Sequence, residues 1–335
     1  MRVLDAEHPH AHVIAEAVAA LRAGRLVVFP TETVYGLGAR ALDAAAVERV
    51  YEVKGRPRSH PLIVHVLDEA AARFHAAEWS PLAEALARAF WPGPLTLVVP
   101  KADFVPTAIT GGGSAVALRV PSHPVARALL DAIGEHDGIV APSANRYQSI
   151  SPTRAEHVTA SLEGHDLLVL DAGPCPSGIE STVVDVRGSE PRVLRPGALT
   201  IQALRAVVPS LQFAHTEVAG DEPRASPGLG TKHYAPSTPL ELAADRASAL
   251  SSATELVRSG QRVGIILFRE SLRRAERDPG APLHVLPGDP VAAGTALYAL
   301  LYELDRQKYD RIVVEPPPAE PGWEAIGDRL HRAAD

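Results

Sequence analysis

The chain has 335 residues, of which 46% are hydrophobic and 22% are charged, and its formal net charge is −7. This composition predicts a packed globular protein of about two domains and argues against intrinsic disorder. It also argues against strong general binding to nucleic acid, because that function needs a basic surface and the sequence contains no long basic block.

A single cysteine, Cys175, rules out an internal disulfide bond and is consistent with a reducing compartment. The N-terminal stretch lacks the basic region followed by an apolar region that forms a secretory signal peptide. No apolar run approaches the roughly eighteen residues that a transmembrane helix needs. We therefore expect a cytoplasmic protein without a membrane partner.

Helical and strand patterns alternate through the first two hundred residues. Apolar residues at helical spacing predict four helices, whose ends are marked by Gly24, Asp43, Gly55, Ser80 and Ser151. Short apolar runs between the helices predict strands over residues 25–29, 61–66, 94–100, 115–121, 138–142, 166–171, 181–186 and 191–196. This alternation predicts an α/β domain.

The pattern changes after residue 212. Residues 213–239 are rich in proline, glycine, serine and threonine and show no apolar periodicity, which predicts a long linker. The remaining chain alternates predicted strands (262–268, 283–287, 310–315) with predicted helices (247–260, 271–277, 290–307, 323–334). This part is predicted to be a small parallel, Rossmann-like α/β domain.

Two glycine-rich stretches look like nucleotide-binding loops but fail their patterns. Residues 36–41 fit the dinucleotide pattern G-x-G-x-x-A, but six residues separate them from the preceding strand and no acidic residue follows at the required distance. In residues 226–234, Thr231 precedes Lys232 and breaks the phosphate-loop pattern. We expect neither type of site.

Arginine and lysine residues at strand boundaries are candidate anion sites. Lys54, Arg56 and Arg58 lie where a helix ends and a strand begins. They are either solvated charges favoured by the helix dipole or a clamp for a polyphosphate. Arg119 lies inside an apolar strand and is either a snorkelling or structurally paired arginine or a carboxylate receptor. The residue types alone leave both choices open.

Small polar side chains also lie near the ends of predicted strands, namely Thr31, Thr33, Ser143, Asn145, Ser149, Ser151, Ser181 and Thr182, with Arg195 at a further strand end. Such residues favour turns, but they could equally form a ring of ligand donors at the sheet edge where α/β proteins bind ligands. The sequence has no CxxC or HExxH motif, so we predict no metal site built by the protein.

Eight segments, in order and spacing, resemble the YrdC-like threonylcarbamoyl-AMP synthases in their long form with an added C-terminal domain: residues 29–38, 54–66, 91–100, 117–124, 141–145, 178–186, 194–197 and 226–239. The resemblance implies a twisted, open, mixed sheet with helices around a large cationic cavity in residues 1–212. It also implies that the linker 213–239 folds over the active site and that residues 240–335 form an accessory domain.

An activity follows from the same resemblance. Such enzymes join L-threonine, bicarbonate and ATP into threonylcarbamoyl-AMP and release pyrophosphate. This nucleotidyltransferase reaction is the first step of the threonylcarbamoyladenosine modification next to the anticodon of tRNA. Mg²⁺ would be carried by the ATP phosphates, and the product would pass to the tRNA threonylcarbamoyl transferase machinery, with no direct tRNA binding by this chain.

The family's functional residues map onto this sequence position by position. The catalytic tetrad corresponds to Lys54, Arg56, Ser143 and Asn145. The resemblance implies that ATP is bound by these four and by His60, Ser151, Arg195 and Tyr234. It assigns the binding of threonine to Thr33, His65, Arg119 and Ser181.

The sequence argues against two other functions. An RNA-binding or regulatory YrdC-like module without turnover is disfavoured by the net charge and by the lack of aromatic residues among the basic ones. A carbamoyl-adenylate enzyme of hydrogenase maturation would carry zinc-type cysteine pairs, and this chain has one cysteine.

Overall fold

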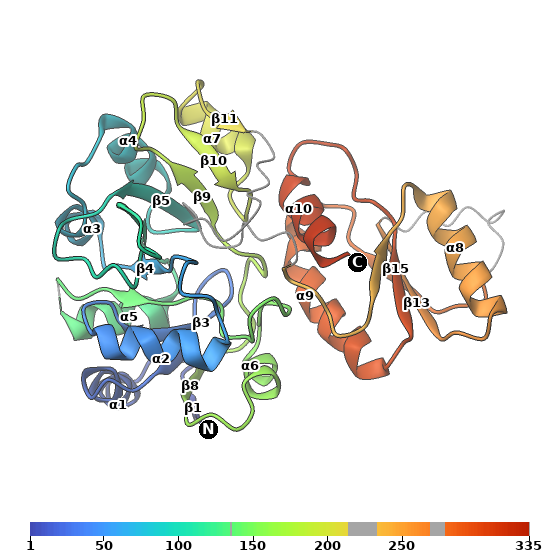
Figure 1. Cartoon of the computed structure of the whole chain (residues 1–335), viewed down its shortest axis with the longest axis horizontal. Helices are drawn as coiled ribbons and strands as arrows, with labels where there is room; N and C mark the ends of the chain where they lie inside the picture. The colour runs from blue at the N-terminus through green and yellow to red at the C-terminus, as the bar shows by residue number, and fades with distance from the viewer. Residues whose placement is uncertain (135, 214–232, 269–278, 335) are drawn as a thin grey trace. The chain divides into compact units, whose positions relative to one another are not determined.

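The computed structural model describes residues 1–134, 136–213, 233–268 and 279–334, and it divides into two compact units (Figure 1). The first unit contains residues 1–147 and continues from Ser151. The second contains Gln148–Ile150 and the described residues from His233 onward. Most of the predicted linker, residues 214–232, lies outside the described residues.

A mixed sheet runs through the first unit. Within the described residues its strand order is β1-β8-β2-β3-β7-β4-β6-β5-β9-β10-β11. The strands are β1 (Arg2–Asp5), β2 (Val27–Pro30), β3 (Tyr35–Arg40), β4 (Ile63–His65), β5 (Leu95–Pro100), β6 (Ala115–Arg119), β7 (Ile139–Val140), β8 (Leu168–Asp171), β9 (Thr182–Asp185), β10 (Arg192–Arg195) and β11 (Gln212–Phe213). Parallel pairs such as β4–β6 and β5–β9 alternate with antiparallel pairs such as β2–β3 and β5–β6, which confirms the predicted mixed sheet.

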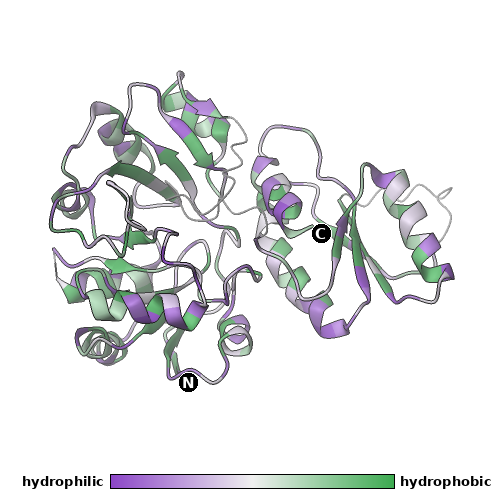
Figure 2. Ribbon diagram, viewed as in Figure 1, coloured by the Kyte–Doolittle hydropathy of each residue, from purple (hydrophilic) through white to green (hydrophobic). Residues whose placement is uncertain are grey.

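Helices cover both faces of this sheet. The helices α1 (Ala11–Arg22) and α5 (Pro124–Ile133) share one apolar core with β2 and β8. Five other helices share the core on the opposite face: α2 (Ala44–Lys54), α3 (Glu69–His75), α4 (Pro81–Phe90), α6 (Ala155–Ser161) and α7 (Ile201–Val207). Figure 2 shows that a buried strand such as β5 is mainly hydrophobic.

Most of the predicted helix ends are found in the structure. Asp43 caps α2 by accepting a hydrogen bond from the Ala46 N–H (2.9 Å), and Gly55 ends the same helix in the left-handed conformation. The prediction that Ser151 caps a helix is wrong. The helix α6 begins at Ala155 with Arg154 at its N-cap, and the Ser151 hydroxyl donates to Glu180 instead.

The glycine-rich residues 36–41 lie mainly in β3, which the sequence patterns did not predict as a strand. β3 pairs antiparallel with β2, so this stretch is one arm of a hairpin and not a strand-to-helix turn. A Cβ atom on Gly38 would lie 2.7 Å from a ring carbon of Phe29, and one on Gly36 would lie 2.9 Å from the Cβ of Ala141. Glycine is therefore needed here for close packing between strands.

The second unit contains a parallel sheet of strand order β12-β15-β13-β14 within the described residues, as predicted. The strands are β12 (Leu240–Leu242), β13 (Val263–Phe268), β14 (Leu283–Leu286) and β15 (Arg311–Val314), and the helices are α8 (Arg246–Arg258), α9 (Pro290–Gln307) and α10 (Glu324–Ala333). β12 was not predicted, and the predicted helix 271–277 lies outside the described residues. No helix in the described part of the chain combines the length and hydrophobicity that crossing a bilayer requires.

Candidate active site

Lys54, at the C-terminal end of α2, reaches the loop that follows β7. Its Nζ donates hydrogen bonds to the carbonyl oxygens of Ser143 (2.5 Å) and Asn145 (2.7 Å), and its own carbonyl accepts from the Tyr147 N–H (2.8 Å). Burial, and secondarily the nearby charge of Arg56, hold the pKa of the Lys54 ammonium well below its usual value. The two hydrogen bonds of Nζ bring together three of the four predicted tetrad residues, Lys54, Ser143 and Asn145.

Arg56 is buried beside the turn that leads into β4. Its Nη2 donates to the carbonyl oxygen of Pro61 (3.0 Å). The ring of His60 lies edge-on to the ring of Tyr147, with the ring centroids 5.4 Å apart. This contact connects the turn before β4 to the loop after β7 that Lys54 binds. Arg58, the third cation of the cluster, is exposed and pairs with Glu48. Of the three basic residues between positions 54 and 58, Lys54 and Arg56 are thus buried and Arg58 lies at the surface.

A second group of polar side chains lies on one face of the sheet. His65 in β4 is directly opposite Arg119 in β6, and Arg119 is directly opposite Thr96 in β5. Side chains of directly paired residues project from the same face of a sheet. Burial, and then the charge of Arg119, lower the pKa of His65 to about 3, so this imidazole is neutral near neutral pH.

Ser181 extends this group toward β10. Its hydroxyl lies 2.8 Å from the Thr96 hydroxyl, and Arg195 Nη2 donates to both the carbonyl oxygen (2.9 Å) and the hydroxyl (3.2 Å) of Ser181. Arg195 is buried at the end of β10. Polar contacts and strand pairing thus connect Arg119 through Thr96 and Ser181 to Arg195.

Glu32 brings a carboxylate to Arg119 from the connection between β2 and β3. Its Oε1 lies 2.7 Å from Arg119 Nη2, and its Oε2 accepts a hydrogen bond from the Ser122 N–H (3.1 Å). Burial alone would raise the pKa of Glu32, but the charge of Arg119 and these hydrogen bonds outweigh burial and lower it, so Glu32 is ionised. Thr33, the neighbouring residue, is fully buried, and its hydroxyl lies 2.8 Å from that of Thr31.

Two predicted nucleotide-binding residues have other partners in the structure. The Ser151 hydroxyl donates a hydrogen bond to Oε1 of Glu180 (2.5 Å), and Glu180 directly precedes Ser181 in the chain. Tyr234 belongs to the second unit, where its buried ring lies 4.7 Å from the guanidinium carbon of Arg329. The contribution of Tyr234 to nucleotide binding stays a prediction.

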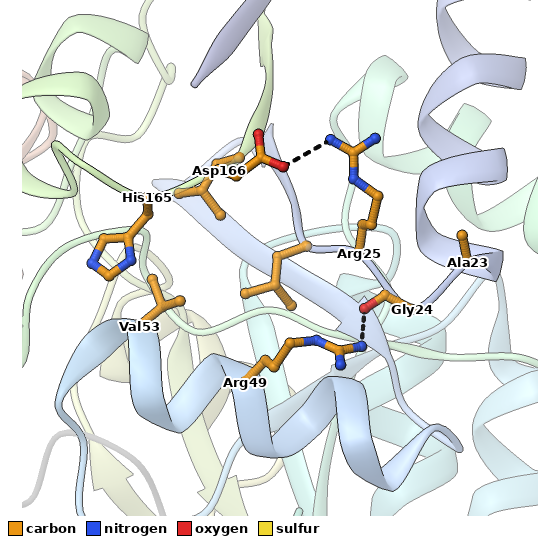
Figure 3. A pocket seen from close by; sticks show the side chains of 9 residues that line it. Ala23, Gly24, Arg25, Arg49, Val53, His165 and Asp166 are labelled. Atoms are coloured by element: carbon orange, nitrogen blue, oxygen red, sulfur yellow. Dashed lines mark hydrogen bonds and ion pairs between the residues drawn. The ribbon is translucent and has the colours of Figure 1, made fainter.

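A pocket of about 350 Å³ lies elsewhere in the first unit, at the amino ends of β2 and β8 (Figure 3). Both arginines that line the pocket have a partner among the other lining residues. Arg49 donates to the carbonyl of Gly24, and Arg25 pairs with Asp166. Thr33, by contrast, follows the carboxyl end of β2, so this pocket is separate from the polar groups described above.

Comparisons with known proteins agree for both units. Residues 19–197 match a family profile described as "Telomere recombination", which groups Sua5, YciO and YrdC, and residues 199–335 match the profile "Threonylcarbamoyl-AMP synthase, C-terminal domain". The threonylcarbamoyl-AMP synthase of Bacillus subtilis is 38% identical, over 96% of this chain and 92% of the relative. The enzyme of the same name from Pyrococcus abyssi is also 38% identical, over 94% of this chain and 92% of the relative.

The chain belongs to the threonylcarbamoyl-AMP synthase family. Two solved structures of the Pyrococcus abyssi Sua5 protein have the same fold as this synthase. One, a complex with L-threonine, has a TM-score of 0.88 at 36% identity and covers 96% of this chain and 94% of its own. The other is a variant in which an adjacent histidine and tyrosine are replaced by alanine. It has a TM-score of 0.90 at 33% identity, and the match covers 100% of this chain and 96% of the variant's chain.

The sequence patterns did not single out two members of the polar group around Arg119, Glu32 and Thr96. A buried arginine needs a partner, so the position of Arg119 inside a strand was a signal to search for an acidic residue. The sequence could not choose among 40 acidic residues, because Glu32 is 87 positions away and meets Arg119 only through the fold.

Proposed function

We propose that this enzyme makes L-threonylcarbamoyl-AMP from L-threonine, bicarbonate and ATP. The observation that carries the proposal is the buried Arg119, which lies beside His65, Thr96 and Glu32 on one sheet face. A buried guanidinium is suited to an amino-acid carboxylate. The relative from Pyrococcus abyssi, crystallised with L-threonine, supports threonine as that amino acid.

The proposed reaction has two balanced steps. The neutral amine of threonine combines with bicarbonate to give a carbamate and water. A carbamate oxygen then attacks the α-phosphorus of ATP, the bond to the bridging oxygen of the β-phosphate breaks, and pyrophosphate leaves. Because the substrates supply the nucleophile, the protein contributes positioning and charge stabilisation.

In this proposal the two groups of buried polar residues have separate roles. Lys54, Arg56 and Arg195 hold the phosphates of ATP, and the smaller donors Ser143, Asn145, Ser151 and His60, together with Tyr234, surround the nucleotide. Arg119 binds the threonine carboxylate, while Thr33, His65 and Ser181 contact the rest of the amino acid. The Ser181 bonds hold the guanidinium of Arg195 in a fixed orientation, which favours binding of a phosphate in one position.

Magnesium belongs to this proposal as the counterion of ATP. In the described part of the chain no three His, Cys, Asp or Glu side chains are grouped to hold a metal ion. Mg²⁺ is commonly held by substrate phosphates and water, so phosphate oxygens would be its main ligands and it would neutralise the departing pyrophosphate. The product would then serve the enzymes that modify the adenosine next to the anticodon of tRNA.

The test is a reconstitution with each substrate omitted in turn. With L-threonine, bicarbonate, ATP and Mg²⁺ all present, we expect threonylcarbamoyl-AMP by mass spectrometry and one pyrophosphate for each product molecule. Leaving out any of the three substrates should abolish the product. Pyrophosphate release that does not depend on threonine contradicts the proposal, and salt-dependent RNA binding without any turnover would favour a binding module.

A further inference from the structure

The ion pair between Glu32 and Arg119 is almost completely buried. The side chain of Arg119 is 4% exposed and that of Glu32 is 9% exposed, with Nη2 and Oε1 2.7 Å apart. A buried ion pair is weak evidence for stability, because the desolvation of two charges offsets most of their attraction. The position of the pair next to His65, in the proposed threonine site, suggests a function in binding.

Each partner retains capacity for hydrogen bonds. Among the described residues, Arg119 Nη2 and Glu32 Oε1 have each other as partners in the ion pair and no further hydrogen-bond partner, and Arg119 Nε has none. The two nitrogens form one edge of the guanidinium, and such an edge makes a two-pronged hydrogen bond with a carboxylate. A carboxylate oxygen has two lone pairs, so Glu32 Oε1 can accept a second hydrogen bond, from an ammonium group, beside its contact with Arg119.

The surroundings contain few competing charges. His65 is neutral because burial and Arg119 lower its pKa, and burial raises the pKa of the Cys175 thiol, which is also neutral. Burial likewise lowers the pKa of His123, whose interaction with Glu32 is the smaller influence on it. Of the groups named here, Arg119 and Glu32 are the two that form an ion pair, one charge of each sign.

An α-amino acid carries the same two charges in complementary form on one carbon atom. We propose that Glu32 is a specificity-determining residue, and that Glu32 and Arg119 together bind a zwitterion. Without an amino acid the two side chains neutralise each other. With one, the Nε and Nη2 edge of Arg119 takes the carboxylate, and Glu32 Oε1 accepts a hydrogen bond from the α-ammonium.

This inference rests on the proposed function, because it assumes that an amino acid binds at Arg119. It adds that the site requires the α-amine and not only the carboxylate. A suitable comparison is L-threonine against the analogue of the same stereochemistry in which a hydroxyl group replaces the α-amine. The ratio of their dissociation constants isolates the contact to the amine, because any effect on Arg119 itself acts on both ligands.

The experiment measures this ratio by calorimetry for the full-length wild type and for Glu32→Gln. We expect the wild type to prefer threonine at least tenfold. In Glu32→Gln we expect the preference to fall by roughly 10- to 100-fold, the value of a hydrogen bond between charged groups. Glu32→Asp keeps the charge on a shorter side chain, so its ratio should lie between those of the wild type and Glu32→Gln. The same variant tests the inference if Glu32→Gln does not fold.

The matched control is Glu48→Gln, which breaks the exposed ion pair with Arg58 and should leave the ratio within twofold of wild type. An unchanged ratio in Glu32→Gln overturns the inference. If both affinities fall equally, Glu32 has a purely structural role. If both rise equally, its carboxylate only competes with the ligand for Arg119. A wild-type ratio near one also overturns it. Wild-type protein that binds none of the twenty amino acids overturns the proposed function as well.

Discussion

The ammonium group of Lys54 is held by the backbone of Asn145, with Nζ and the carbonyl oxygen 2.7 Å apart. A second hydrogen bond joins the same Nζ to the carbonyl of Ser143. Lys54 therefore fixes the loop that carries two other members of the predicted tetrad. In a nucleotide site it would act both through its charge and through the shape of this loop.

Lys54→Ala should therefore impair ATP binding more than threonine binding. The substitution removes a buried cation and leaves two carbonyl groups without their donor. We expect the affinity for a non-hydrolysable ATP analogue to fall at least tenfold and that for threonine to change less than threefold, as measured by calorimetry. Arg58→Ala, at an exposed cation nearby, should change neither. Equal losses for both ligands in a folded variant would refute the separate roles.

Arg119→Met should destabilise the first unit. It leaves the Glu32 carboxylate buried without a counter-charge, which typically costs about 3–5 kcal/mol. Adding Glu32→Leu should restore most of the unfolding free energy, because the second charge is removed, but it should not restore threonine binding. Urea denaturation and calorimetry measure the two effects.

The exposed pair of Glu48 with Arg58 is the control for this comparison. Breaking it with Glu48→Gln should change the unfolding free energy by less than about 1 kcal/mol. If Arg119→Met unfolds at the wild-type urea concentration, the buried pair has no structural role.

His65 should make the protein sensitive to acid. Its pKa is about 3 in the folded protein, below the ordinary value of 6.5, so the unfolded chain binds a proton that the folded one does not between these pH values. Stability contributed by the neutral imidazole is therefore present above pH 6.5 and is lost as pH falls toward 3.

Comparing wild type with His65→Gln tests this acid sensitivity. Between pH 6.5 and 4.5 we expect the wild type to lose about 2 kcal/mol more unfolding free energy than His65→Gln. His8→Gln, at an exposed histidine, should follow the wild-type curve. A His65→Gln curve parallel to that of the wild type would show that this histidine is not buried as a neutral group.

The glycines of β3 should not tolerate a side chain. Gly38→Ala places a methyl group against the ring of Phe29, and such overpacking typically destabilises by about 1–3 kcal/mol. Gly327→Ala is the matched control in α10, where the nearest heavy atom outside the helix backbone is the Cγ of Pro317, 3.7 Å from the new methyl. We expect this change to stabilise the second unit by about 0.5–1 kcal/mol, since alanine is the better helix former. Gly38→Ala with wild-type stability in urea would disprove the close packing of β2 and β3.

Local patterns predicted most of the elements because they depend on neighbours in the chain. The Asp43 cap, the left-handed Gly55 and the apolar strands of both sheets follow from spacing and residue type. β3 was missed because its glycines have low strand propensity and are placed for contact with β2 and with Ala141. The Ser151 cap was wrong because the serine bonds to Glu180, a partner 29 residues away.

The sequence by itself determined the α/β class, the parallel second domain, the buried cations Lys54, Arg56, Arg119 and Arg195, and most of the polar residues near them, because periodicity, caps and motif order are local properties. It did not single out Glu32 or Thr96. Only the tertiary structure decided which of those residues meet. Strand register places His65, Arg119 and Thr96 in one row, and the hairpin of β2 and β3 brings Glu32 to Arg119. These contacts join residues far apart in the chain, and their energies depend on burial and orientation, which spacing along a sequence does not specify.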